Sequence, residues 1–276
     1  MNKILSVFIA LCLLFFVMTA VTAQDQSAAP SGEKSEVIVF AAASMTESMN
    51  KIAEMYKKIA PDVTITFNFD SSGTLKTQIE EGADCDIFIS AGQKQMDQLD
   101  IKADPKINTD KLDFVLEESR FNLVNNTVVL IVPEDSKAEI TSFDDVLTDK
   151  VKLVALGNSD VPVGQYSEEI FTSLGIWDKL KASGKISYAT NVKEVLSQVE
   201  AAAVDCGVVY STDAATAKGV SVVATAPEKS HKAIVYPAAM LKTSKNQEAA
   251  KAFLDYLKSS DAASVFEEIG FTIPNK

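Results

Sequence analysis

Short apolar runs alternate with longer amphipathic stretches from residue 36 to the end of the chain. The apolar runs, such as VIVF at 37–40, are rich in β-branched residues and are typical of strands. The stretches between them carry apolar residues at helical spacing. This alternation indicates an α/β fold with parallel sheets. The predicted strands lie at 37–40, 63–69, 86–90, 127–133, 151–157, 186–188, 207–210, 220–227 and 233–241. The predicted helices lie at 46–59, 74–81, 94–99, 165–174, 192–203, 247–259 and 262–269.

The strands fall into two groups, which indicates two lobes. A polar stretch at 100–118 follows the third strand, and a second group begins at 127. About 250 residues beyond the N-terminal segment suit two domains of ordinary size. The last two strands return the chain to the first lobe. The predicted lobes comprise 36–123 with 225–276, and 124–224.

The first residues have the features of a secretion signal. Lys3 supplies a positive start, an apolar run extends over 4–21, and Val-Thr-Ala ending at Ala23 offers small residues to signal peptidase. We expect cleavage near Ala23, a flexible linker at 24–35 and a periplasmic location. A retained membrane anchor over 1–23 is the alternative. The apolar run is short for a span, however, and a polar tract follows it at once.

Three cysteines bear on location and folding. Cys12 lies within the apolar run, where Leu11 precedes it instead of the small residue that lipid attachment would favour, so we expect no lipid anchor there. Cys85 and Cys206 each precede a strand-like run. A disulfide between them is one alternative in an oxidising compartment. Two buried thiols in different lobes are favoured.

The chain is acidic. It has 26 Lys and Arg against 38 Asp and Glu, a formal charge of −12, and loss of residues 1–23 removes one lysine and gives −13. Nucleic acids and anionic membranes reward clustered Lys and Arg, so we expect neither as a partner. A small anion is not excluded, because its binding depends on the local field at its site.

The inventory of chemical groups argues against an enzyme. His231 is the only histidine and Arg120 the only arginine. A serine hydrolase would use His231 as the base for Ser44 or Ser72, but no serine-elbow motif is present. Zinc would need several His or Cys ligands, and no Gly-rich run ends in Gly-Lys-Ser or Gly-Lys-Thr. A hydrolase stays only as the rival hypothesis.

Four strand ends lead through small or turn residues into a predicted helix. They are AAASMTES at 41–48, SSGTLKTQ at 71–78, DVPVGQYSEE at 160–169 and TNVKEVLSQ at 190–198. The first N–H groups of a helix lack internal partners and carry partial positive charge. Parallel sheets place such helix starts at one edge, where the four can converge on an anion in a cleft. The alternative is that Ser44, with Glu47 three residues on, and Ser72 are plain N-cap residues.

A set of runs carries a resemblance that covers nearly the whole mature chain. The runs are VIVFAAASMTESM, FDSSGTLKTQIEEGADCDIFISA, VPVGQYSEE, GVVYSTDA, PEKSHKAIVYPAAM and EEIGFTI. In them the sequence resembles the periplasmic molybdate-binding proteins of ABC transporters. The resemblance implies the α/β fold of type II periplasmic binding proteins. That fold has two lobes, each a mainly parallel sheet flanked by helices, joined by two hinge crossings.

The resemblance also implies a set of binding residues. That family holds its oxyanion by hydroxyl and main-chain N–H groups, without a counter-charge. Carried over by motif, the ligand-binding residues are Ser44 and Ser72 with a hydroxyl and an N–H each, Val163 and Val192 with an N–H each, and Tyr210 with its phenol. The alternatives are that the two valines are core or first-turn residues and that the tyrosine only closes its strand.

Two positions and one segment depart from the pattern of that family. Position 163 commonly carries a smaller residue than valine. Gly73 stands where related sequences often have another serine, which leaves open whether Ser71 takes the place of Ser72. The segment 100–120 is longer than usual, so the position of the lobe crossing after it stays open.

The implied function is capture of molybdate or tungstate and delivery to an inner-membrane ABC permease. Molybdenum or tungsten would be present only as the oxyanion; we expect no cofactor, and a monomer. Donors alone suit a fully ionised dianion, whereas hydrogen phosphate would leave its O–H unpaired at a cost of about 1–3 kcal/mol. Sulfate passes this test. A receptor for sulfate or a small carboxylate is therefore the alternative within the same class.

Overall fold

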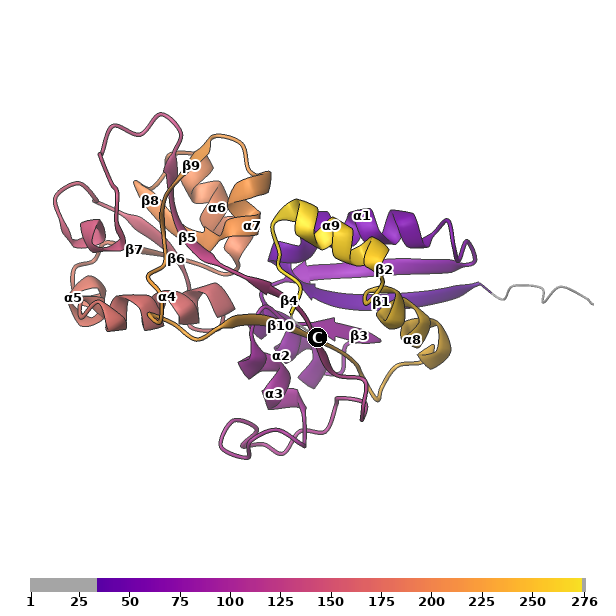
Figure 1. The fold of residues 1–276 in the computed structure, drawn as a ribbon. Coiled ribbons are helices and arrows are strands. Elements are labelled where there is room, and N and C mark those ends of the chain that lie inside the picture. Colours follow the sequence, from indigo (N-terminus) through magenta and orange to yellow (C-terminus); the bar gives the residue numbers. More distant parts are fainter. Residues whose placement is uncertain (1–33, 275–276) are drawn as a thin grey trace, which may run out of the picture. The chain divides into compact units, whose positions relative to one another are not determined.

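The computed structural model of the protein describes residues 34–274, which contain two five-stranded sheets (Figure 1). The first has the strand order β2-β1-β3-β10-β4. β1 pairs in parallel with β2 and β3, and β10 is antiparallel to β3 and β4. Its strands are β1 (Ser35–Ala42), β2 (Val63–Asp70), β3 (Ile87–Ile89), β4 (Phe121–Asn126) and β10 (Ile234–Met240). We call this sheet with its helices lobe 1.

The second sheet repeats this plan with the order β7-β6-β8-β5-β9. β6 pairs in parallel with β7 and β8, and β5 is antiparallel to β8 and β9. Its strands are β5 (Val128–Pro133), β6 (Val154–Gly157), β7 (Ile186–Ala189), β8 (Cys206–Tyr210) and β9 (Val220–Thr225). This sheet with its helices is lobe 2.

Helices cover both faces of each sheet, which explains why the inner strands are apolar throughout. In lobe 1, alternate β1 residues serve two separate clusters of buried side chains, with Val39 in one and Phe40 in the other. One face carries α1 (Thr46–Tyr56), α8 (Gln247–Tyr256) and α9 (Ser260–Ile269), and the other α2 (Ser72–Glu80) and α3 (Gln93–Leu99) (Figure 1). Lobe 2 carries α4 (Pro162–Ser173), α5 (Trp177–Ala182), α6 (Val192–Glu200) and α7 (Ser211–Thr216). Two short 3₁₀ helices are η1 (Ala43–Met45) and η2 (Phe143–Leu147).

The chain crosses between the sheets twice. The first crossing is at Thr127, between β4 and β5, and the second spans 226–233, between β9 and β10. The prediction that the last two strands both return to lobe 1 is wrong for β9, which pairs with β5 in lobe 2. Two lobes joined by two crossings confirm the predicted fold class. Each sheet is more mixed than expected, because two of its four pairings are antiparallel.

Several short elements escaped prediction. β4 carries the sequence FNLVNN, whose three asparagines conceal its strand character, and α5, α7 and the 3₁₀ helices are too short to show a period. The long stretch before β4 consists of turns, and the Arg120 guanidinium ties it to α3 through Asp97 and to Asp100 at 2.8 Å. It therefore belongs to lobe 1 and precedes the crossing.

Cys85 and Cys206 are free, buried thiols in different lobes, as the sequence favoured, so the disulfide alternative is wrong. No helix within residues 34–274 is long and apolar enough to span a membrane. The predicted signal peptide at 1–23, with Cys12, and the linker up to residue 33 lie outside the described residues.

Candidate functional site

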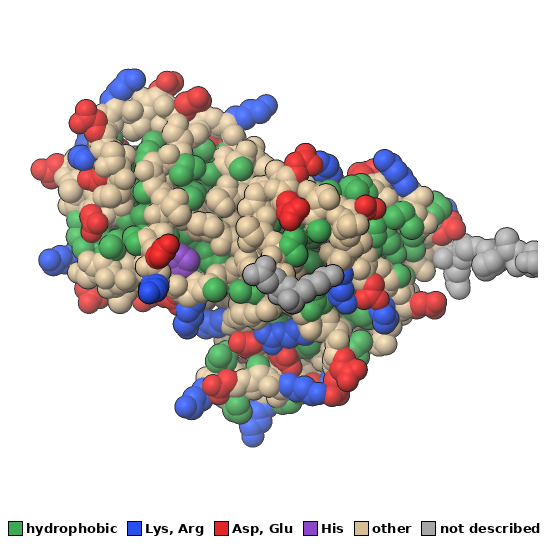
Figure 2. Space-filling model, viewed as in Figure 1, with side chains coloured by type: hydrophobic (Ala, Val, Ile, Leu, Met, Phe, Trp, Pro, Cys, Tyr) green, Lys and Arg blue, Asp and Glu red, His purple; other side chains and the backbone are tan. Residues whose placement is uncertain are grey.

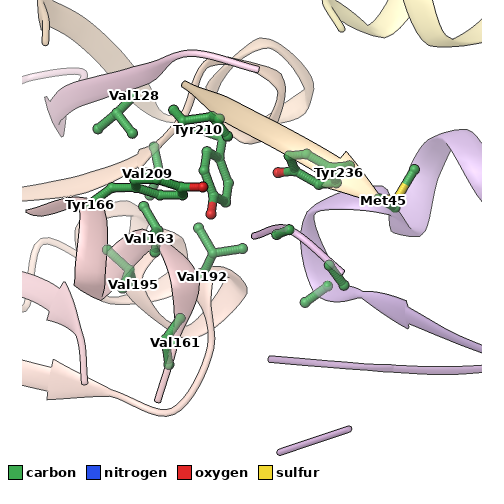
Figure 3. Close-up of a cluster of buried hydrophobic side chains, with 14 of the residues drawn as sticks. Met45, Val128, Val161, Val163, Tyr166, Val192, Val195, Val209, Tyr210 and Tyr236 are labelled. Atoms are coloured by element: carbon green, nitrogen blue, oxygen red, sulfur yellow. The ribbon is translucent and has the colours of Figure 1, made fainter. Parts of the chain in front are cut away.

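The five residues predicted to bind a ligand surround one small cavity. They come from five different elements: η1, α2, α4, α6 and β8. Each is at most 3% exposed. Figure 3 shows Val163, Val192 and Tyr210 close together, with Tyr236 directing its hydroxyl toward Tyr210. The fold thus brings together all the residues of the predicted set.

Ser44 is not an N-cap residue, so that alternative is wrong. η1 carries the chain through Met45, and α1 begins at Thr46 without a side-chain cap. The Oγ atom of Ser44 lies 2.9 Å from the Oη atom of Tyr236. Glu47, the expected capping partner, forms an ion pair with Lys193 instead. A contact with a distant strand therefore positions the Ser44 hydroxyl.

The adjacent serines at the start of α2 have different roles. Ser71 is the N-cap residue, and its Oγ accepts the Thr74 N–H at 3.1 Å. Ser72 is the first helical residue, and its Oγ accepts the Ala91 N–H at 2.9 Å. The cap interpretation of Ser72 is therefore wrong. Since the Ser72 oxygen accepts from Ala91, its own proton remains for a further acceptor.

The two valines lie in the first turns of their helices. Val163 follows Pro162 at the start of α4, and Val192 follows the N-cap residue Asn191 at the start of α6. N–H groups at these positions have no intrahelical acceptor. Neither has an acceptor elsewhere in the described part of the chain. Their side chains pack in the core, so core packing and a free N–H coexist in each valine.

Tyr210 ends β8 with its phenol inside the protein. Its ring packs edge-on against Tyr236 at 5.8 Å and Tyr166 at 6.5 Å between centroids. Burial raises the pKa of the phenol well above its usual value, so it stays protonated. Its Oη has no hydrogen-bond partner among the described residues. An unpaired buried hydroxyl costs about 1–3 kcal/mol, which a ligand oxygen would recover.

Asp70 also borders the cavity, and the sequence analysis missed it. Its Oδ1 accepts the Ser71 N–H at 2.7 Å and the Nδ2 of Asn191 at 3.1 Å. Asn191 caps α6, because its Oδ1 accepts the Glu194 N–H at 3.0 Å. One side chain thus joins the helix start in lobe 2 to the end of β2 in lobe 1. No local pattern signals a contact between residues 121 positions apart.

An ion group centred on Lys193, the residue after Val192, links the lobes. The Nζ of Lys193 lies 2.9 Å from Glu47 of lobe 1 and 3.1 Å from Asp213 of lobe 2. Burial raises the pKa of Asp213 to about 6, although Lys193 acts to lower it. Burial alone would lower the pKa of Lys193, but the two carboxylates more than offset it and the pKa is raised. Lys193, which directly follows Val192, is therefore paired with carboxylates of the protein itself.

The arrangement suits binding of a small anion without a counter-ion. No Lys or Arg of residues 34–274 borders the cavity. His231 does not border it, and its Nδ1 lies 2.6 Å from the Lys232 carbonyl oxygen. Within the described residues, no cluster of His, Cys, Asp and Glu could hold a metal ion.

The fold and the cavity define a two-lobed binding protein for a small solute. A family model described as "Bacterial extracellular solute-binding protein" matches residues 37–272. The chain therefore belongs to this family. Because the members of this family are solute-binding proteins, the prediction that the chain is not an enzyme is confirmed.

Relatives of known name are similar over most of the chain. YvgL of Bacillus subtilis, named as an ABC transporter substrate-binding lipoprotein, is 39% identical over 273 residues, 99% of each chain. The molybdate-binding protein ModA of Escherichia coli is 40% identical over 251 residues, 87% of this chain and 90% of ModA. The periplasmic molybdate-binding protein of Azotobacter vinelandii superposes with a TM-score of 0.75 over 87% of this chain and 100% of its own, at 23% identity. This last match shows a shared fold.

Proposed function

We propose that the protein captures molybdate or tungstate in the cavity between its lobes and delivers it to a membrane permease of the ABC type. The observation that carries the proposal is the convergence of hydroxyl and N–H donors from both lobes on a cavity that no Lys or Arg of the described chain borders. The ModA name of a relative 40% identical supports the choice of ligand. We further propose a monomer, with the lobe boundaries at the two crossings, Thr127 and 226–233.

The proposed ligands to the oxyanion are the five predicted residues. Ser72 and Tyr210 each have a hydroxyl proton without an acceptor in the described chain. Val163 and Val192 offer first-turn N–H groups, whose partial positive charge favours an anion. Ser44 adds its hydroxyl from η1 in lobe 1. Asp70 opposes the charge of any dianion, so hydrogen bonds from both lobes must supply the attraction.

Titration calorimetry with molybdate, tungstate, sulfate and phosphate tests the ligand. We expect molybdate and tungstate to bind much more tightly than sulfate, and phosphate to bind weakest. Sulfate binding as tight as molybdate would assign the protein to the sulfate receptors. Absence of binding by all four anions would refute an oxyanion receptor altogether.

Ser44→Ala tests whether the Ser44 hydroxyl contacts the ligand. A hydrogen bond to a charged group contributes about 1.5–3 kcal/mol, so we expect roughly a 10- to 100-fold rise in the Kd for molybdate. The free protein should also lose about 1–3 kcal/mol of stability, because the buried Tyr236 hydroxyl loses its partner at 2.9 Å. Ser48→Ala is the matched control, since Ser48 is buried in α1 and its Oγ donates to the Met45 carbonyl at 3.0 Å. Equal affinity losses in both variants would remove Ser44 from the site.

We propose that the protein is exported and that its signal peptide is cleaved after Ala23. Mass spectrometry of the protein from its native host should then show a chain that begins at Gln24. Because YvgL is named as a lipoprotein, the competing outcome is a chain with a lipid anchor. A chain that begins at Cys12 and carries the mass of attached acyl groups would overturn our assignment. An unprocessed chain would show that the segment is kept as an anchor.

A further inference from the structure

Two acids of lobe 1 bond the residues on either side of Val192. Asn191, the residue before it, directs its Nδ2 to the Oδ1 of Asp70 at 3.1 Å. Lys193, the residue after it, places its Nζ 2.9 Å from both carboxylate oxygens of Glu47. Asp70 ends β2 and Glu47 lies in the first turn of α1. The start of α6 in lobe 2 is therefore joined to lobe 1 at two points, with a residue that borders the cavity between them.

The same two acids lie close in sequence to the serines of the site. Asp70 is two residues before Ser72, and Glu47 is three residues after Ser44. Because so little chain separates each acid from its serine, a contact with the acid also limits the distance to the serine. The two contacts thus help to set the position of Val192 relative to both serine hydroxyls.

Asn191 bonds Asp70 and caps its own helix at the same time. Its Oδ1 accepts the Glu194 N–H at 3.0 Å, and this backbone group can only donate, so the orientation of the amide is fixed with its Nδ2 toward Asp70. Serine would cap α6 about as well, but it lacks the amide nitrogen that reaches Asp70. Aspartate would also cap the helix, but it would present a second negative charge to Asp70. The amide is therefore suited to a contact between the lobes.

Charge distinguishes the start of α6 from α4, the other helix that carries a valine of the site. On α4, Gln165 accepts from the Nε2 of Gln95 in lobe 1 at 3.3 Å, a longer contact between neutral groups. Both contacts of α6 use a carboxylate, and hydrogen bonds to charged groups are the stronger kind. Charged side chains of both signs are scattered over the face of the molecule in Figure 2, so an ion pair within one lobe is ordinary. The contacts of α6 differ in that they exist only while the lobes are together.

Separation of the lobes must break both contacts of α6. Residues of both lobes surround the cavity, so a bound ligand leaves only when the lobes part. The contacts therefore oppose release. They do not oppose entry, because an incoming ligand meets the lobes before they close. Contacts that form after entry act on the dissociation rate constant and little on the association rate constant.

We propose that Asp70 and Glu47 are positioning residues that latch the start of α6 to lobe 1, hold the Val192 N–H on the bound oxyanion and slow its release. This inference rests on the proposed oxyanion-binding function. A carboxylate offers the anion no donor, so each acid acts through α6. The latch also gives a reason for a carboxylate at the border of an anion cavity. The Oδ1 of Asp70 accepts from Asn191 and from the Ser71 N–H at 2.7 Å, and so joins the two helix starts.

Asn191→Ser removes the amide donor and keeps the helix cap. A chase of bound radiolabelled molybdate with excess unlabelled molybdate measures release, and calorimetry gives the Kd. We expect the dissociation rate constant and the Kd both to rise about tenfold, as for one lost hydrogen bond to a charged group, and the association rate constant to stay unchanged. The ligand-free protein should melt at nearly the same temperature, because the cap is kept.

Asn246→Ser is the matched control for the loss of an amide donor. The Nδ2 of Asn246 donates to the Glu36 carbonyl oxygen at 2.8 Å, and both residues belong to lobe 1. The same substitution there removes a hydrogen bond within one lobe. Release of molybdate should therefore be unchanged.

Exchanging the two side chains tests the contact itself. Asn191→Asp sets a carboxylate against that of Asp70, and release should be faster than in Asn191→Ser. Adding Asp70→Asn restores a pair of one amide and one carboxylate with the roles exchanged, so release should slow again to within about threefold of the unaltered protein. Asp70→Asn alone completes the cycle and accounts for the loss of a negative charge near the anion.

Glu47→Gln tests the second contact, and it decides the matter should the variants at Asn191 fail to fold. The Glu47 side chain is 39% exposed, so its replacement leaves the core of lobe 1 intact. We expect release to become roughly two- to fivefold faster, the range for a partly exposed ion pair, with association unchanged.

A purely local role for Asn191 in α6 predicts a different pattern. Asp70→Asn would then not reverse the effect of Asn191→Asp, and the proposal would be wrong. It would also be wrong if the variants weakened binding by slowing association, or if Asn191→Ser and Glu47→Gln released molybdate as slowly as the unaltered protein. Failure of the unaltered protein to bind any oxyanion refutes the proposed function itself, which is a separate result.

Discussion

Replacing Gly73 with alanine should weaken molybdate binding about 100-fold or more without weakening the fold. Gly73 lies in the first turn of α2 in lobe 1. A Cβ atom there would come within 2.2 Å of the carbonyl oxygen of Asp160, on the loop before α4 in lobe 2. The lobes could not then approach as they do, and the N–H groups of Val163 and Val192 would be held away from the anion. Two lost hydrogen bonds to a charged group amount to at least about 3 kcal/mol, or roughly 100-fold.

The free protein should become slightly more stable in Gly73→Ala. Alanine is favoured over glycine within a helix by about 0.5–1 kcal/mol, and an open arrangement of the lobes relieves the clash. Calorimetry gives the affinity, and a thermal melt without ligand gives the stability. Gly175→Ala is the inverse control. Its φ of +71° should cost stability, while its Cβ meets nothing within 4 Å and affinity should hold. Unchanged affinity in Gly73→Ala would show that the lobes bind the ligand without this contact.

The contact at Gly73 shows where sequence reasoning reached its limit. The strands and helices around the site could be predicted, because apolar spacing is a local property and helix starts follow strand ends. The five site residues were chosen by resemblance, and the fold places them around one cavity. From the sequence alone, Gly73 could be described only as a position where related sequences often have a serine. Its reason is a carbonyl in the other lobe, which no local pattern records.

The serines at the site show the same limit for individual side chains. Ser44 and Ser71 both precede a helix by one or two residues, yet only Ser71 caps one. The difference is that the 3₁₀ turn η1 delays the start of α1 and turns Ser44 toward Tyr236, 192 positions away. Asp70 and Asn191 likewise meet only through the arrangement of the lobes. Local chemistry was readable from the sequence, and the pairing of distant side chains was not.

Replacing Lys193 with methionine should destabilise the free protein by about 3–5 kcal/mol at pH 8. Asp213 is fully buried, and Lys193 lies 3.1 Å from its Oδ1. Removing one partner of a buried ion pair leaves the other charge uncompensated, which carries a penalty of that size. Lys251→Met is the control, because its ion pair with Asp255 is on the surface and should contribute less than about 1 kcal/mol. Urea unfolding of the two variants measures the difference.

The loss of stability in Lys193→Met should be larger at high pH than at low pH, because the buried Asp213 carboxyl group is charged only at the higher pH. The pKa of Asp213 in the folded protein is about 6, above its ordinary value of 3.8, so protonation favours the folded state. Its contribution is fully present below about pH 4 and is lost as the pH rises through about 6. Without Lys193 the folded pKa rises further, and the loss extends to higher pH. At pH 5 Asp213 is mostly protonated with or without the lysine, so the variant and the unaltered protein should differ by less than about 1 kcal/mol.

A second substitution separates charge from packing in this ion group. Lys193→Met with Asp213→Asn removes both buried charges, and we expect it to recover most of the stability lost at pH 8. Glu47 then stands alone, but it is 39% exposed and water can solvate it. A loss that is the same at pH 5 and pH 8, and that Asp213→Asn does not reverse, would mean that the aliphatic part of Lys193 matters and its charge does not. Recovery would instead show that the charge of Lys193 stabilises the protein mainly by offsetting the buried charge of Asp213.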